Sequence, residues 1–158
     1  MVGMLADDLR ARGHEMQIIA AVPHYPSGEV SWGYRERMYH ESTQDGILVG
    51  RVRIPGGDRS DLGHRVFAYL IYQLVSSIYA FSTKCDLILA TNPAIETGVP
   101  FLIVAGLRRK PGVWLVWDLY PEIGIRLGIF HSRPVKAIVG WLENRCLRAA
   151  ARVQSLSA

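Results

Sequence analysis

Short, mainly apolar segments alternate with helical patterns along this chain, and this alternation constrains its fold more than any other feature. A short continuous apolar run is typical of a strand covered on both faces, as in parallel sheets. Parallel neighbours need a crossover connection, which the intervening helices supply. The pattern places strands at 16–22, 47–54, 86–90 and 112–117, and helices at 65–85, 97–110 and 133–151. The sequence therefore predicts an α/β fold with a Rossmann-like, doubly wound and mainly parallel sheet.

The two ends of the chain look like interior parts of such a fold. Residues 2–12 form an amphipathic helical pattern from the start, with Gly13 as its C-cap. No strand precedes this helix, and the last residues, "ARVQSLSA", look like the start of another strand. We therefore expect residues 1–158 to be one domain that lacks its first strand. The edge left open beside strand 16–22 would favour self-association.

Two local expectations concern the connections. Residues 23–46 are rich in turn-forming and charged residues without an apolar pattern, which predicts a long loop. The helix expected from Thr97 to Lys110 has Pro100 in its first turn, where proline is tolerated.

The charge balance bears on partners and location. The chain carries 18 Lys and Arg against 14 Asp and Glu, a formal net charge of +4. That excess favours anionic partners such as phosphates or lipid head groups, although a solvated basic surface gives the same count. No motif of the known nucleic-acid-binding modules occurs, so no nucleic acid is expected as a partner. Acidic residues at 7 and 8 stand where a secretory signal would be apolar, which favours a cytoplasmic location.

The helix at 65–85 raises the question of membrane contact. Its uncharged part, residues 66–81, is shorter than the roughly 20 apolar residues that a spanning helix requires. A helix buried in protein is the favoured interpretation. The alternative is peripheral attachment on the inner face of the plasma membrane, because Tyr69, Tyr72 and Tyr79 suit an interface and basic residues flank the segment.

Polar clusters follow three of the expected strands. In a parallel α/β sheet the carboxyl ends of the strands share one edge, and ligands bind there. Taken singly, these residues have structural explanations: Asp118 can cap the next segment, and Thr91 and Asn92 can satisfy backbone groups. Taken as a set, they favour a binding site. The candidates are His24, Tyr25, Thr91, Asn92, Asp118, Tyr120 and Glu122.

Several other chemistries lack their motifs. Neither G-x-G-x-x-G nor the P-loop pattern occurs, and there is no G-x-S-x-G nucleophile elbow. The five histidines have no metal-binding spacing, and the two cysteines, Cys85 and Cys146, are far apart. No metal and no cofactor are therefore expected.

Five segments occur in an order that carries a family resemblance. They are "LADDLRARGHEMQIIAAVPHYPSGEVSWGY", "QDGILVGRVRIP", "DLILATNPAIETG", "DLYPE" and, more loosely, "LENRCLRAAARVQSLS". With them the chain resembles the amino-terminal domain of retaining family 4 glycosyltransferases of the GT-B fold, especially bacterial enzymes of polysaccharide biosynthesis. The resemblance covers nearly the whole chain. Many members carry His before the Asp of "DLYPE", where this chain has Trp117, so no catalytic residue is assigned.

The resemblance implies a hexosyltransferase-type enzyme that transfers sugar from a nucleotide-sugar to a glycan or polyprenyl-linked acceptor with retention. The donor would bind mostly in a carboxyl-terminal domain that this chain lacks, and the seven candidates would bind the acceptor. The chain alone is then expected to be inactive. A second function stays open: a non-catalytic subunit that binds an acceptor or a membrane for a separate catalytic chain.

Overall fold

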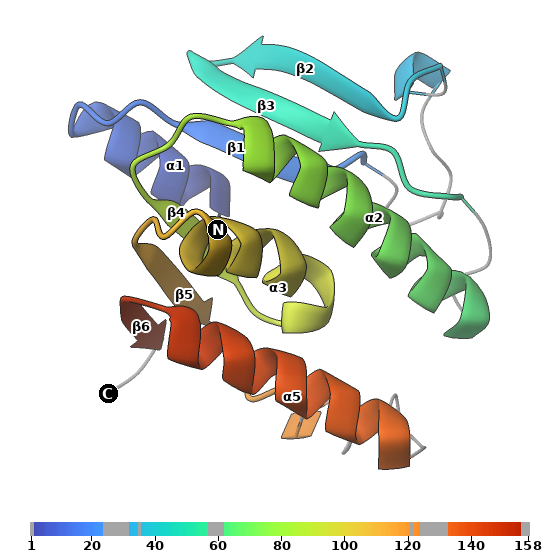
Figure 1. Cartoon of the computed structure of the whole chain (residues 1–158). Helices are drawn as coiled ribbons and strands as arrows, with labels where there is room; N and C mark the ends of the chain where they lie inside the picture. The colour runs from blue at the N-terminus through green and yellow to red at the C-terminus, as the bar shows by residue number, and fades with distance from the viewer. Residues whose placement is uncertain are drawn as a thin grey trace. The chain divides into compact units, whose positions relative to one another are not determined.

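The computed structural model describes residues 2–23, 32–34, 36–56, 62–120, 122–123 and 133–155. They belong to two compact units, Met1–Val75 and Ser76–Ala158, and each unit contains one three-stranded sheet. We call them sheet A, with strand order β1-β3-β2, and sheet B, with order β4-β5-β6 (Figure 1). Three of the four described strand pairings are parallel. The predicted α/β fold of Rossmann-like type, with mainly parallel pairing, is confirmed.

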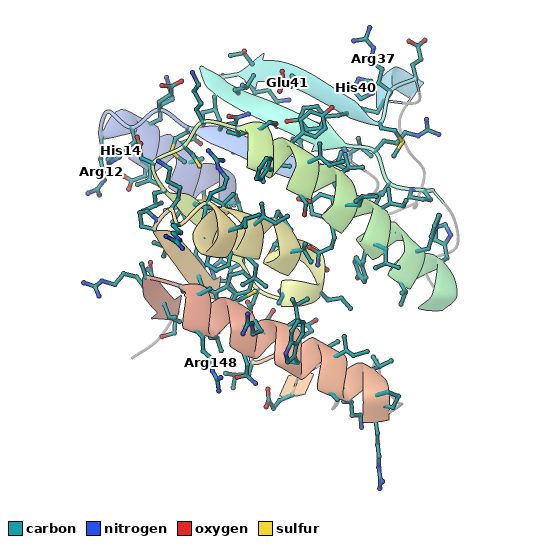
Figure 2. The ribbon with its side chains drawn as sticks, viewed as in Figure 1. Arg12, His14, Arg37, His40, Glu41 and Arg148 are labelled. Carbon is teal, nitrogen blue, oxygen red and sulfur yellow. The ribbon has the colours of Figure 1, made fainter. Side chains whose placement is uncertain are left out.

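The first unit begins with α1 (Val2–Ala11), the helix predicted from its amphipathic pattern. Gly13, with φ of 91°, follows its end, and the Gly13 N–H donates to the Arg10 carbonyl at 2.9 Å. The His14 N–H donates to the Leu9 carbonyl at 3.2 Å, which completes a Schellman motif. Figure 2 shows His14 just beyond this end of the helix. The predicted C-cap glycine is therefore confirmed.

Sheet A has a small core beneath α1. Its central pair is parallel, with β1 (Gln17–Ala21) alongside β3 (Ile47–Val52). Ala6 of α1 packs against Ile47 and Val49, and all three side chains are buried. Among the strands that the structure describes, β1 has β3 as its sole neighbour.

The predicted loop at 23–46 is wrong in its last part. It contains a short 3-10 turn, η1 (Trp32–Tyr34), and then β2 (Tyr39–Gln44), which pairs antiparallel with β3. Asp45 and Gly46 connect these two strands with φ of 49° and 78°, the signs that a type I′ hairpin turn requires. The strand escaped prediction because its residues "YHESTQ" are polar, and the last four are exposed in the structure. The Asp-Gly pair was the available signal.

The long helix α2 (Leu62–Ser82) buries small and polar side chains, Ala68 and Ala80 among them. Its buried side chains include Gln73, Ser76 and Ser77, whereas large apolar side chains along another face are exposed. The hydroxyl of Tyr72 donates to the Ile19 carbonyl of β1 at 3.2 Å. The exposed set lies at helical spacing, and we call it the α2 stripe; it consists of Phe67, Leu70, Leu74, Ile78 and Phe81. No helix among the described residues is long and apolar enough to cross a membrane.

Sheet B is parallel throughout. It consists of β4 (Ile88–Thr91), β5 (Gly112–Val116) and β6 (Arg152–Ser155), with β5 in the centre. The helices α3 (Ala94–Leu102) and α5 (Arg133–Ala149) contribute to one core with β5. Four of its side chains are fully buried: Ala94, Phe101, Trp114 and Cys146.

The start of α3 differs from the prediction. The helix begins at Ala94, three residues before Thr97, so Pro100 lies inside it rather than in its first turn. Pro93 stands at the N-cap position and gives no side-chain cap. A π-helical turn, η2 (Ile103–Leu107), continues the helix towards β5. Helical structure is therefore present where it was expected, but its amino terminus lies directly after β4.

Candidate functional site

The carboxyl ends of β4 and β5 lie next to each other. Thr91 stands opposite Leu115 in the parallel register, and the Asn92 N–H extends the ladder by donating to the Leu115 carbonyl at 2.9 Å. The chain then turns into α3 after β4, and into the segment from Trp117 to Glu122 after β5. Two of the three predicted polar clusters therefore meet at one edge of sheet B.

Asn92 fixes the first residues after β5. Its side chain is 6% exposed, and its Oδ1 accepts from the Trp117 N–H at 2.9 Å and the Asp118 N–H at 3.4 Å. Its Nδ2 donates to the Asp118 carbonyl. Both polar atoms of the Asn92 side chain are thus bonded to backbone. Buried polar groups with such partners hold the local backbone in one conformation.

The turn after β5 presents two carboxylates. The Tyr120 N–H donates to the Asp118 carbonyl at 3.0 Å, and the Ile123 N–H donates to the Leu119 carbonyl at 2.8 Å. Asp118 and Glu122 are exposed, and Tyr120 is half-buried. The carboxylates can accept hydrogen bonds from a ligand, while the backbone beneath Asp118 is held by Asn92.

Thr91 contributes its backbone to this edge. Its carbonyl accepts a hydrogen bond from the Thr97 hydroxyl at 2.5 Å, so the first turn of α3 is tied back to the end of β4. The Thr91 residue is half-buried. For Asn92, the structural role considered from the sequence is present in the fold, because its side chain satisfies backbone groups; for Thr91 that role stays a prediction. A ligand role for them stays a prediction.

His24 and Tyr25, the candidates of the first cluster, lie outside the described residues. The strand before them, β1, is followed by Val22, whose N–H still donates to the Val52 carbonyl at 2.9 Å. Their expected proximity to Asp118 stays a prediction.

Glu143 of α5 is a buried acid that the motifs and strand-end clusters of the sequence did not indicate. Its Oε2 accepts from the Ala94 N–H and its Oε1 from the Trp114 indole N–H, both at 2.9 Å. The available signal was its position on the apolar face of a helix, four residues after Val139 and three before Cys146, all three of which are buried. An acid at such a position is expected to have hydrogen-bond partners, because burying it without them costs several kcal/mol, roughly 2–7 for even a neutral polar group.

The same surroundings make Cys146 an unreactive thiol. Burial, with Glu143 nearby as the smaller cause, raises the pKa of Cys146 to about 12. The reactive form of cysteine is the thiolate, so this residue does not serve as a nucleophile near neutral pH. Within the described parts of the chain, no group of three or more His, Cys, Asp or Glu is placed to hold a metal ion.

Residues 1–158 match the family described as Glycosyl transferase 4-like domain. No curated protein matches the chain.

Proposed function

The chain belongs to the family of glycosyl transferase 4-like domains, and from this premise we propose that it is the acceptor-binding part of a glycosyltransferase. The enzyme would transfer a hexose from a nucleotide-sugar to a glycan or a polyprenyl-linked acceptor. We include in this proposal retention of the anomeric configuration, a GT-B arrangement with a second domain for the donor, and a place in bacterial polysaccharide synthesis. These finer points rest on the resemblance of the sequence motifs.

One observation carries the assignment of the acceptor site. The exposed carboxylate of Asp118 lies on a turn that is hydrogen-bonded to the buried Asn92. The backbone of this turn donates two N–H groups to the Asn92 side chain and accepts one hydrogen bond from it. A sugar acceptor offers hydroxyl donors, and hydrogen bonds to a charged partner are stronger than those between neutral groups. A fixed turn lowers the cost of ordering the carboxylate when the acceptor binds. Tyr120 and Glu122 continue the same turn and would add stacking and further acceptors.

The chemistry requires positioning more than a special nucleophile. The acceptor hydroxyl forms a bond to the anomeric carbon, the bond to the diphosphate oxygen breaks, and the hydroxyl proton leaves to a base. Correct placement of the two reactants supplies much of the rate. Cationic groups and helix amino termini would stabilise the departing diphosphate. We assign Asp118 to holding the acceptor and leave the base unassigned.

The test is a substitution in the full-length native protein. Asp118→Asn should lower kcat/KM for transfer roughly 10- to 100-fold, the effect of losing a hydrogen bond to a charged group. Asp86→Asn is the matched control, because Asp86 is also exposed but precedes β4, at the other end of the strand. Transfer from a panel of nucleotide-sugars is measured for both variants. Equal turnover in Asp118→Asn and the control would remove the site assignment.

We also propose that the α2 stripe lies against an anionic membrane surface, near lipid-linked acceptors. The helix exposes large apolar side chains along one face, so this face favours an apolar environment. Residues 62–82 contain no Asp or Glu, and Lys84 beyond the end of the helix is exposed. Basic groups near an anionic bilayer contribute about 1 kcal/mol each, and salt weakens this attraction.

Liposome flotation separates this proposal from its alternatives. The full-length protein should float with anionic vesicles at low salt, less at high salt, and little with neutral vesicles. Leu74→Glu should abolish flotation, while Val153→Glu, at an exposed apolar position of β6, should not. Equal flotation of both variants would exclude the α2 stripe as the contact. Flotation without any sugar transfer would favour the non-catalytic, membrane-binding subunit.

A further inference from the structure

Glu143 lies at the centre of the packing between α5 and sheet B. It is 4% exposed, on the inner face of α5 together with Val139 and Cys146. The packing here is close, since a Cβ on Gly98 of α3 would lie 3.1 Å from the Cys146 sulfur and 2.9 Å from the Ala94 methyl group. An acid in such a place is unfavourable unless each oxygen has a donor.

Each carboxylate oxygen of Glu143 has its own donor. Oε2 accepts from the N–H of Ala94, the first residue of α3, and Oε1 accepts from the Trp114 indole N–H of β5. The first N–H groups of a helix lack intrahelical partners, and the Pro93 side chain supplies no cap. Glu143 therefore provides, from another helix, a cap that the local sequence cannot provide.

Glu143 and Asn92 connect the same two segments of chain. One segment is Asn92–Ala94, at the junction of β4 and α3; the other is Trp114–Asp118, at the end of β5. Glu143 joins them through Ala94 and Trp114, and Asn92 joins them through the backbone of Trp117 and Asp118. Two buried polar side chains thus hold one junction, and the second of them holds the turn that presents Asp118.

We propose that Glu143 is a positioning residue of the acceptor site. By fixing Ala94 and Trp114, it holds Asn92 in register with the turn at 117–118 and so sets the place of the Asp118 carboxylate. The enzymatic part of this inference rests on the proposed function. Glu143 itself is buried and touches no acceptor.

The substitution Glu143→Gln tests this role directly, because a glutamine cannot accept from both the Ala94 N–H and the Trp114 indole N–H. Its amide offers one acceptor oxygen, and its NH₂ group then faces a second N–H group. Removing the indole donor with Trp114→Phe relieves this conflict, because the glutamine oxygen is then free for Ala94. The double variant should therefore recover part of what the single Glu143→Gln variant loses. Rescue of this kind is not expected if Glu143 acts only by filling space.

The experiment uses the full-length native protein, at a temperature where circular dichroism shows each variant folded. We expect Glu143→Gln to raise KM for the acceptor about 10-fold, as for an unsatisfied buried donor, with KM for the nucleotide-sugar within about twofold. The double variant should bring the acceptor KM to within about threefold of the Trp114→Phe value. Glu41→Gln, at an exposed position of β2 labelled in Figure 2, is the control and should behave as wild type.

A second measurement does not depend on activity. In protein labelled with ¹⁵N at Trp and Asp, Glu143→Gln should shift the backbone amide signals of Trp117 and Asp118, and Glu41→Gln should not. An unchanged acceptor KM with unmoved amide signals overturns the proposal. If Glu143→Gln does not fold, Trp114→Phe carries the same test with a smaller expected rise in acceptor KM. If wild type transfers no sugar, the proposed function fails, and the amide signals alone decide whether Glu143 positions the turn.

Discussion

Each sheet combines apolar strands with one polar, exposed edge strand, but the connections of the two sheets are held in different ways. In sheet A, β2 and β3 are joined by a two-residue turn whose shape comes from the backbone of Asp45 and Gly46. In sheet B, the ends of β4 and β5 are held by the buried side chains of Asn92 and Glu143. The turn at Asp45 and Gly46 only reverses the chain, and for this the right backbone angles are enough. The turn that carries Asp118, the residue proposed to bind the acceptor, is held by a buried polar side chain.

The largest test of this contrast is the core of sheet B. Trp114→Ala should lower the free energy of unfolding by about 3–5 kcal/mol, through the cavity beside Phe101 and the loss of the donor to Glu143. Ile47→Ala in the core of sheet A should cost about 2 kcal/mol, because a smaller side chain is removed. Urea denaturation followed by far-ultraviolet circular dichroism measures both. A larger loss for Ile47→Ala would contradict the contrast.

Removing the Asn92 side chain, which holds the backbone of Trp117 and Asp118, should have an intermediate effect on the free energy of unfolding. Asn92→Ala leaves the N–H groups of Trp117 and Asp118 without their acceptor, at a cost of about 1–3 kcal/mol. Amide hydrogen exchange at these two positions should become faster. Gln44→Ala is the matched control, because this amide at the end of β2 is exposed and should change stability by less than about 0.5 kcal/mol. If amide hydrogen exchange at Trp117 is unchanged in Asn92→Ala, the turn does not depend on the Asn92 side chain.

The alkaline limit of stability should come from the core of sheet B. The pKa of Cys146 is raised from 9.0 to about 12 in the folded chain, so above pH 9 the unfolded state releases a proton that the folded state keeps. Stability from this group is present in full below pH 9 and is lost up to about pH 12, with a slope of roughly 1.4 kcal/mol per pH unit at most. Denaturation at pH 8 and pH 10 should show this loss in wild type and in Cys85→Ser. Cys146→Ala should show a smaller loss, and an equal one would rule out this thiol as the cause.

The smallest effect is expected at the hairpin of sheet A. Gly46→Ala puts a side chain on a residue with φ of 78°, which costs about 1 kcal/mol. An added Cβ would meet only the end of the Arg10 side chain, which can move, so the cost lies in the backbone. Gly3→Ala is the control, because Gly3 is in α1 with open space around it and should be neutral or slightly stabilising. A Gly46→Ala protein as stable as wild type would argue against the type I′ turn.

The sequence predicts the elements of sheet B better than those of sheet A. Strands 86–90 and 112–117 are apolar apart from Asp86, and the structure has them as Ile88–Thr91 and Gly112–Val116. The polar edge strand β2 has no such pattern, because most of its side chains face solvent. This strand forms because it pairs with β3, a tertiary contact that the spacing of apolar residues along the sequence does not reveal.

The candidate site also has a part that the sequence predicts and a part that it does not. That Asn92 and Asp118 come together follows from their positions after neighbouring parallel strands, and the structure confirms it. The hydrogen bonds by which Asn92 holds the turn cannot be predicted from its residue type alone, because they depend on atomic contacts in the folded chain. Glu143 lies far along the chain from both, and its role needs the packing of α5 against α3 and β5.

The difference in connections also has a consequence for the order of folding. Gln44 pairs with Ile47 across a two-residue turn, whereas Thr91 pairs with Leu115 across a connection that contains all of α3. Hairpins form within about 1–10 μs, while distant parallel pairs must first close a long loop and form more slowly. We expect β2 and β3 to acquire protection from hydrogen exchange before β4 and β5 in a pulse-labelling experiment. The turn that presents Asp118 would then be among the last parts of the chain to reach its final geometry.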